Sequence, residues 1–241
     1  ADTDISPYDS GSYASSTTYV TGKAVEQACE KLKNNLCDLA LQTFHCEKED
    51  VEFTSQGVKN LKTNELLTLK ELALKAMCGN NIETQVTVTH SSPVSPPPYM
   101  VGMVEIELDK ETGQVDILDY VAVVDCGTVI NTNLARVQTE GGLVQGIGMA
   151  LYEDVQYTKR GAIPENSFMQ YKIPTRLDMG KIRVEFESSY EPTGPFGAKS
   201  IGEIVINTPS PAIANAIYRA TDKYLKDLPM TPEKILMAID E

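Results

Sequence analysis

The sequence has no tryptophan, two widely separated histidines (His45 and His90) and no closely spaced pair of cysteines. Structural zinc sites need close Cys or His pairs, and iron–sulfur clusters need four thiolates in characteristic spacings, so we expect the chain itself to supply no metal ligands. An odd number of unpatterned thiols predicts reduced cysteines and a cytoplasmic location. The five cysteines are Cys29, Cys37, Cys46, Cys78 and Cys126.

Basic residues are also scarce, with 21 Lys and Arg against 34 Asp and Glu and a net charge of −13. This balance disfavours nucleic acids and anionic membrane surfaces as partners. No run of apolar residues is long enough to span a membrane, and the acidic start at Ala1–Asp4 is unlike a signal peptide. With 41% hydrophobic residues, the chain is expected to fold around one large or two small cores.

Residue periodicity predicts an α+β fold with two sub-domains of mixed sheets and packed helices. Four prolines within 91–98 favour an extended path and mark the boundary, which gives sub-domains 1–92 and 93–241. Helical spacing predicts helices over 22–39, 67–77 (capped by Asn64 or Thr68), 134–151 and 211–218, and a last helix from Pro232. Alternation predicts strands over 84–89, 100–108, 115–125 and 182–187, and a hairpin within 50–64.

The segment 193–203 combines three glycines with a single terminal carboxylate, Glu203. Glycines allow tight turns and close approach of a ligand to the backbone. Glu203 therefore either faces a ligand held by this loop or complements the start of a helix.

Two further stretches could likewise serve either a ligand or the local structure. The hydroxyl-rich residues 7–19 precede a helix, where they can form a neutral cradle for an anion or simply cap the helix. The helix over 134–151 contains four glycines that each disfavour helix, so either another helix or a ligand approaches its backbone. Gln138 and Gln145 lie two turns apart on one face of this helix.

Four motifs, taken in order, resemble the molybdenum hydroxylases, which include xanthine dehydrogenase, aldehyde oxidase, carbon monoxide dehydrogenase and nicotinate dehydrogenase. The resemblance covers nearly the whole chain and matches the C-terminal part of the molybdopterin-binding subunit. The motifs are residues 2–11, the glycine- and glutamine-rich 138–148, Tyr-Lys-Ile-Pro-Thr at 171–175, and the segment 194–203 followed by 211–216.

The resemblance implies a hydroxylase or dehydrogenase that inserts water-derived oxygen at an electrophilic carbon of an N-heterocycle or aldehyde. Glu203 matches the base that acts on a molybdenum-bound hydroxide. A solvated carboxylate is a weak base at neutral pH, so the resemblance also implies that a partner buries Glu203. The implied cofactor is molybdopterin with molybdenum, as the cytosine dinucleotide in bacterial-type split enzymes, with iron–sulfur clusters and FAD on partner subunits.

Carried over by position, the resemblance also assigns residues to the cofactor and the substrate. Gln138 is expected to hydrogen-bond the cofactor near the metal, and Tyr13 to reach toward the substrate. Cofactor contacts are expected from the hydroxyl-rich loop at Ser12, Ala14, Ser15 and Thr17, and from the backbone of Lys199, Ser200 and Ile201.

The chain departs from the family in lacking the N-terminal half of the molybdenum subunit, so it is either a subunit of a split enzyme or an excised fragment. We therefore expect the chain to form half a site. Its activity is expected to depend on the missing half of the molybdenum subunit, an iron–sulfur subunit and an FAD subunit. Apolar helix faces are expected to mark the partner surface. Two other hypotheses are a non-catalytic assembly module and an acidic α+β domain that binds a phosphorylated small molecule at residues 10–18.

Overall fold

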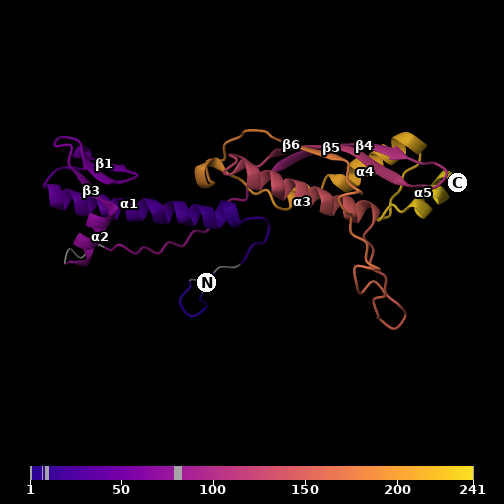
Figure 1. Cartoon of the computed structure of the whole chain (residues 1–241), viewed down its shortest axis with the longest axis horizontal. Coiled ribbons are helices and arrows are strands. Elements are labelled where there is room, and N and C mark those ends of the chain that lie inside the picture. The colour runs from indigo at the N-terminus through magenta and orange to yellow at the C-terminus, as the bar shows by residue number, and fades with distance from the viewer. Residues whose placement is uncertain (1, 7, 9–10, 79–82, 241) are drawn as a thin grey trace. The chain divides into compact units, whose positions relative to one another are not determined.

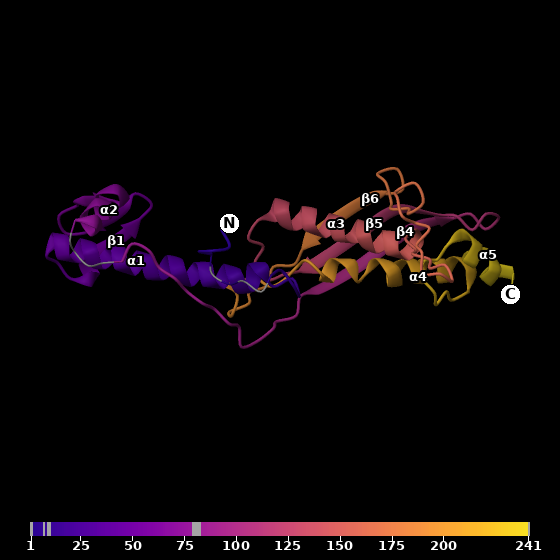
Figure 2. The same ribbon diagram turned by 90° about the horizontal axis from the view of Figure 1, so that it is seen from below.

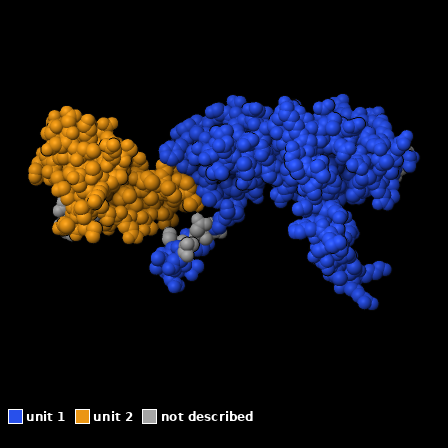
Figure 3. Space-filling view, in the orientation of Figure 1, with its two compact units in different colours: residues 1–19, 94–241 blue, residues 20–93 orange. Residues whose placement is uncertain are grey.

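The computed structural model describes residues 2–6, 8, 11–78 and 83–240. The chain forms two compact units, residues 1–19 with 94–241 (unit 1) and residues 20–93 (unit 2), coloured separately in Figure 3. Each unit combines helices with its own three-stranded sheet, which confirms the predicted α+β class. Among the described residues, no helix has the length and hydropathy needed to cross a membrane.

Unit 2 is built on a long helix, α1, and a small antiparallel sheet (Figure 1). The helix α2 begins at a capping box in which Thr68 and Glu71 bond each other's backbone N–H, so Thr68 is the predicted cap. The buried hydrophobic cluster of unit 2 consists of Leu39, Ala40, Val58 and Leu72. The elements are α1 (Gly22–Phe44), β1 (Val51–Thr54), β2 (Gly57–Asn60), β3 (Leu66–Thr68) and α2 (Leu69–Met77).

The predicted strand over 84–89 is wrong, because the described residues 83–93 form no strand. This segment instead lies beside α1: the Asn35 side-chain amide donates to the Glu83 carbonyl at 2.9 Å, and Gln27 Nε2 lies 3.3 Å from His90 Nδ1. Alternating residues become a strand only when a neighbouring strand supplies hydrogen bonds. Here side chains of α1 contact the segment.

Unit 1 contains a mixed sheet in the order β4–β5–β6. The antiparallel β4–β5 pair turns at Gly113, whose φ is +76°, as the sequence predicts, and β6 runs parallel to β5 after the chain crosses through α3 (Figures 1 and 2). The elements are β4 (Tyr99–Leu108), β5 (Val115–Asp125), α3 (Thr132–Leu151), β6 (Lys181–Phe186), α4 (Pro209–Thr221) and α5 (Pro232–Asp240). Mixed pairing is confirmed for this sheet, whereas the sheet of unit 2 is wholly antiparallel.

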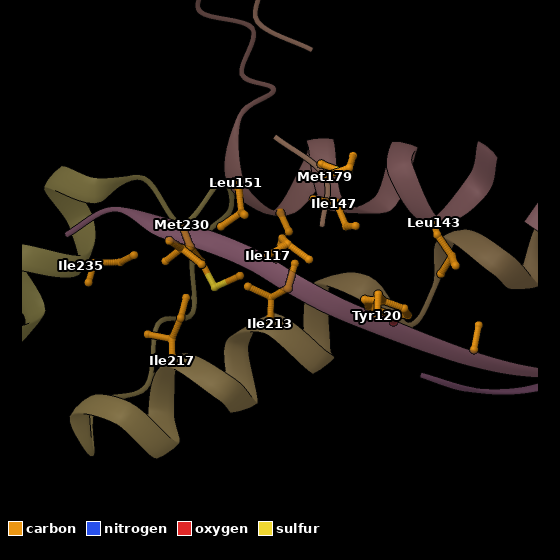
Figure 4. Close-up of a cluster of buried hydrophobic side chains, with 13 residues drawn as sticks. Ile117, Tyr120, Leu143, Ile147, Leu151, Met179, Ile213, Ile217, Met230 and Ile235 are labelled. Carbon is orange, nitrogen blue, oxygen red and sulfur yellow. The ribbon is translucent and has the colours of Figure 1, made fainter. Parts of the chain in front are cut away.

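The core of unit 1 lies between β5 and the helices (Figure 4). Tyr120 of β5, Leu143 and Ile147 of α3, and Ile213 and Ile217 of α4 are completely buried there. Removing such side chains from water supplies most of the favourable free energy of folding. The face of β5 that carries Tyr120 therefore fixes the positions of both helices.

A bulge in the β4–β5 pair keeps apolar side chains on that face. Glu105 pairs with Asp119, but Ile106 pairs with Ile117, so Leu118 is the additional residue of β5. Burial changes phase at this point, from Val115 and Ile117 to Tyr120, Ala122 and Val124. The extra residue resets the two-residue alternation, as β-bulges do.

The N-terminal residues belong to unit 1, although the sequence placed them in a sub-domain over 1–92. The Glu203 backbone N–H donates to Ser15 Oγ at 2.7 Å, and the Tyr19 hydroxyl lies 2.7 Å from Thr193 Oγ1. These contacts join two ends of the chain that are separated by unit 2 in the sequence. The other boundary of unit 2 lies at residue 93.

Close packing accounts for glycines of α3. A Cβ on Gly142 would lie 2.1 Å from Val205 Cγ2, and one on Gly146 would lie 2.7 Å from Pro209 Cγ. Val205 belongs to η4 (Ile204–Ile206), the short 3-10 helix that follows Glu203 directly. The missing side chains thus let α3 approach the chain on the C-terminal side of Glu203.

Gly142→Ala is predicted to destabilise the chain by about 1–3 kcal/mol, because the rigid, buried Val205 side chain must move. Gly141→Ala is the matched control, since a Cβ at Gly141 meets nothing within 4 Å. It should stabilise the helix by up to about 1 kcal/mol. Urea unfolding of both variants measures the difference, and equal free energies of unfolding would contradict close packing at Gly142.

Candidate functional site

Three segments that are distant in sequence meet around a cavity of about 350 Å³ in unit 1, here called the hydroxyl cavity. One is the N-terminal loop, another is α3 through Gln138, and the third ends at Glu203. Most predicted site residues therefore come together. The lining residues are Ser12, Tyr13, Ala14, Ser15, Thr17, Thr18, Gln138 and residues 201–203.

Ser15 connects the N-terminal loop to Glu203 by two hydrogen bonds. Its hydroxyl oxygen accepts the Glu203 backbone N–H at 2.7 Å, and its O–H donates to Glu203 Oε2 at 3.1 Å. Glu203 immediately precedes η4, but its side chain caps no backbone N–H of that helix. The carboxylate lies in the cavity wall, where it accepts the Ser15 hydroxyl.

The backbone of the N-terminal loop has an unusual conformation at the cavity. Ala14 and Ser15 both adopt left-handed φ values, +49° and +56°. Such residues are disfavoured by about 1–2 kcal/mol each and persist only where surrounding contacts hold them, often at functional sites. The hydroxyls of Ser12 and Thr17 bond each other, and Ser16 Oγ donates to the Tyr13 carbonyl at 2.9 Å.

The hydroxyls of this loop lie at and before the start of a π-helix, η1 (Thr17–Thr21), which runs directly into α1. Ser12, Ser15 and Thr17 line the hydroxyl cavity. Pro7, Asp9 and Ser10, which belong to the first motif, lie outside the described residues.

The two glutamines of α3 differ in position. Gln138 lines the hydroxyl cavity, and a Cβ on Gly202 would lie 3.9 Å from its Nε2. Gln145, two turns further along, lines neither this cavity nor the one beside it. Tyr13 reaches the cavity with an exposed ring.

A second cavity of about 280 Å³, here called the proline cavity, adjoins the first and shares Ala14, Ser15, Ile201 and Glu203 with it. Its other wall is the stretch Ser95–Pro98, which the sequence predicted only as a linker. Asn207 also lines it and was not anticipated, like Thr18 in the hydroxyl cavity. The remaining lining residues are Ser200 and Ile204.

Lys199 lines neither cavity, although it was predicted to line the cofactor site through its backbone. Its backbone N–H donates to the Cys126 carbonyl at 2.7 Å, and its Nζ lies 2.7 Å from Asp125 Oδ2. Ser200 lines the proline cavity alone, and Ile201 lines both. The predicted trio thus occupies three different environments.

Asp125 lies at the end of β5 and accepts hydrogen bonds from several donors. Burial alone would raise the pKa of this carboxyl, but hydrogen bonds from Lys199, Ser189 and the Gly127 N–H outweigh that effect and lower it. A lowered folded-state pKa stabilises the fold above the unfolded value near 3.8, and this contribution is lost as pH falls through the lower folded-state pKa. The Asp125 carboxyl is therefore ionised at neutral pH.

The scan against family models matches residues 1–180 to the molybdopterin cofactor-binding domain. The chain belongs to this family. Among curated relatives, it is 33% identical over its full length to the probable hypoxanthine oxidase XdhD of Escherichia coli. It is 34% identical, over 98% of its length, to the gamma subunit of the 6-hydroxypseudooxynicotine dehydrogenase complex of Paenarthrobacter nicotinovorans.

Solved structures give the same result. The reconstituted CO dehydrogenase from Oligotropha carboxidovorans superposes with a TM-score of 0.88 at 25% identity, over 99% of this chain and 31% of that one. The chain spans 25% of the length of XdhD and 31% of that of the gamma subunit. The resemblance to large subunits of molybdenum hydroxylases is thus confirmed, and the chain corresponds to about a quarter to a third of such a subunit.

The hydroxyl cavity suits a molybdopterin cofactor chemically. Its donors include the hydroxyls of Ser12, Ser15 and Thr17 and the amide of Gln138, and neither Lys nor Arg lines it. Hydroxyl and amide groups both donate and accept hydrogen bonds, which matches a heterocycle and a phosphate held by many directed bonds. Among the described residues, no three His, Cys, Asp or Glu side chains cluster as metal ligands.

Ser15→Ala removes both hydrogen bonds to Glu203 and is predicted to increase hydrogen exchange of the Glu203 amide by about tenfold, the equivalent of one hydrogen bond. Ser16→Ala is the matched control, because Ser16 Oγ donates to the Tyr13 carbonyl and makes no hydrogen bond to Glu203. Amide exchange of the full chain followed by NMR distinguishes them. The same exchange rate in both variants would show that Ser15 does not hold Glu203.

Proposed function

We propose that the chain is part of a molybdenum-dependent hydroxylase and contributes the base and one wall of its cofactor site. The observation that carries this proposal is the position of Glu203, a single carboxylate that borders both the hydroxyl cavity and the proline cavity. A group between a cofactor and a substrate has the geometry that proton transfer needs. The family match supports the choice of cofactor.

In this proposal, the molybdenum cofactor supplies a two-electron redox centre when it is bound. Ser12, Ser15 and Thr17 hydrogen-bond the pterin or its phosphate, and Gln138 hydrogen-bonds the cofactor near the metal. Glu203 accepts a proton at a carboxylate oxygen from the water-derived nucleophile that attacks the substrate. Ser15 orients that carboxylate by its bond to Oε2. Ala14 and the backbone of Ile201, which also line the cavity, are proposed to contact the cofactor.

The proline cavity is proposed to receive the substrate, an N-heterocycle or aldehyde with an electrophilic carbon. Pro96, Pro97 and Pro98 present flat apolar surfaces and have no backbone N–H. Such a wall suits a planar ring, and Asn207 and Ser200 offer polar contacts at its edge. Tyr13 lines the hydroxyl cavity and not the proline cavity, so we propose that it approaches the substrate from the cofactor side.

We propose that the site is completed by further protein, either the missing half of the molybdenum subunit or a large partner subunit. Tyr13 is 63% exposed, and Glu203 and Gln138 are also exposed, whereas a catalytic base and its cofactor require shielding from water. An apolar surface on α3 supports the same proposal, since Leu134 and Val137 are 69% and 58% exposed.

The partner chains are proposed to be an iron–sulfur subunit and an FAD subunit that remove the electrons, with the cofactor held as the cytosine dinucleotide. A relative described as one subunit of a dehydrogenase complex supports a multi-chain assembly. The five cysteines are free thiols, which supports assembly in the reducing cytoplasm.

Glu203→Gln in the assembled enzyme is predicted to lower kcat by at least about a hundredfold, because Gln keeps the shape of the side chain but cannot accept the proton. Glu185→Gln, at an exposed position of β6, is the matched control and should retain parental turnover. Molybdenum content measured on the same samples should equal the parental value in both variants.

Unchanged turnover of Glu203→Gln with full molybdenum content would refute the catalytic role. An assembly that contains this chain but holds no molybdenum would instead favour a non-catalytic assembly module. These two results separate loss of the base from loss of the cofactor.

A further inference from the structure

Lys199 has an unusual environment for a lysine. Its relative exposure is 8%, and it is the one charged residue in the buried class among the residues that the structure describes. Its Nζ contacts Asp125 Oδ2 at 2.7 Å and lies 5.2 Å from the centre of the Tyr99 ring. Burying an ammonium group is unfavourable unless a carboxylate and further contacts compensate.

Asp125 is itself held in place. Its Oδ1 accepts the Ser189 hydroxyl at 2.5 Å and the Gly127 backbone N–H at 3.0 Å. It is the last residue of β5, whose side chains pack against α3 and α4. The carboxylate that Lys199 contacts is therefore part of the rigid sheet.

Backbone contacts reinforce this attachment. The Lys199 N–H donates to the Cys126 carbonyl at 2.7 Å, and the Thr128 N–H donates to the Gly197 carbonyl at 2.8 Å. Gly127 and Ala198 form an isolated antiparallel bridge. The segment that leads to Glu203 is thus paired with the chain that leaves β5, and Lys199 is the last residue of that pairing.

Further hydrogen bonds hold the two ends of the same segment: the Ala198 N–H donates to the Pro195 carbonyl at 3.0 Å, and the Glu203 N–H donates to Ser15 Oγ at 2.7 Å. The segment contains Gly194, Gly197 and Gly202, and Phe196 adopts a left-handed φ of +51°. Glycines give the backbone more freedom than any other residue. Four residues after Lys199 the chain reaches Glu203, so a shift at Lys199 moves the base.

We infer that the Lys199–Asp125 pair is a latch that fastens the Glu203 segment to the end of β5 and sets the distance of the base from Ser15 and Gln138. Both members of the pair are positioning residues. Lys199 contacts Asp125 and does not line the hydroxyl cavity, so it adds no positive charge there. The link to catalysis rests on the proposed function, whereas the mechanical link does not.

The chain provides a matched control for this latch. Asp119 lies on the same strand as Asp125 and pairs with Arg183 of β6 at 2.6 Å, so it is also a carboxylate of β5 held by a cation. Arg183 is exposed and Asp119 is half-buried, and the pair lies outside the Glu203 segment. Asp119→Asn therefore removes an ion pair from the strand and leaves the latch intact.

The experiment compares Lys199→Met, Asp125→Asn, the double variant and Asp119→Asn in the assembled enzyme. Latch variants are expected to increase hydrogen exchange of the Lys199 and Thr128 amides by about tenfold or more. They should lower kcat by about 10- to 100-fold with KM within about twofold, because a displaced base slows the chemical step and leaves substrate binding intact. Molybdenum content should stay at the parental value.

The double variant matters because Asp125→Asn leaves the buried Lys199 ammonium without a carboxylate, a penalty that could prevent folding, whereas Lys199→Met leaves a half-buried Asp125 that still accepts from Ser189 and the Gly127 N–H. With both charges removed, that penalty is absent, and a loose Glu203 segment would reflect the missing latch alone. Parental exchange rates and parental kcat in the double variant would overturn the inference. Equal loosening by Asp119→Asn would also overturn it, by showing a general effect of weakening the sheet.

Glu203→Gln measured alongside separates the two proposals. Lost turnover with normal amide exchange in Glu203→Gln, combined with faster exchange in the latch variants, supports both. Full turnover in Glu203→Gln refutes the proposed base, while faster exchange in the latch variants would still establish the mechanical link. Unchanged exchange in the latch variants refutes the latch whatever Glu203 does.

Discussion

The candidate site depends on how closely α3 can approach the chain that follows Glu203. Val205 and Pro209 lie against positions of α3 where only glycine leaves room, at Gly142 and Gly146. Any side chain there would push the helix away from η4, and Gln138, one turn before Gly142, would move with it. The geometry of the site therefore depends on this close packing. The glycines disfavour the helix locally, but they allow the approach of α3 that places Gln138 near Glu203.

The positive charge of Lys199 is kept out of the hydroxyl cavity. The hydroxyl cavity is lined by neutral donors and one carboxylate, while Lys199, four residues before Glu203, contacts Asp125. A cation inside the cavity would pair with Glu203 and weaken it as a base. Directing Lys199 to Asp125 keeps the positive charge on the structural side of the loop and leaves the carboxylate to its Ser15 hydrogen bonds.

Local patterns predicted most helices and strands because their periods are set by the element itself. The helix over 134–151 and the β4–β5 hairpin with its Gly113 turn are examples. The predicted strand over 84–89 failed because alternation says nothing about whether a pairing partner exists. The bulge at Leu118 could not be predicted from the sequence either, because it depends on how β4 pairs with β5.

The same limit applies to the site. Glu203, Ser15 and Gln138 could be predicted from motifs that keep their order along the chain. The proline wall at Ser95–Pro98 could not, because a proline-rich stretch has the same local signature whether it links two units or lines a cavity. The inward direction of Lys199 was equally inaccessible, as it is decided by Asp125, which lies far away in sequence.

The insertion of unit 2 between the two halves of unit 1 has a consequence for folding order. Ser15 and Glu203 are separated by 188 positions, and residues 20–93 lie between Ser15 and the rest of unit 1. Contacts of such long range form only after the entropy of closing the intervening loop has been overcome, and a folded insertion shortens that loop. The β4–β5 hairpin and α3 can assemble from local contacts, whereas the N-terminal loop joins them across the insertion. The site is therefore expected to be completed late, on a core that has already formed.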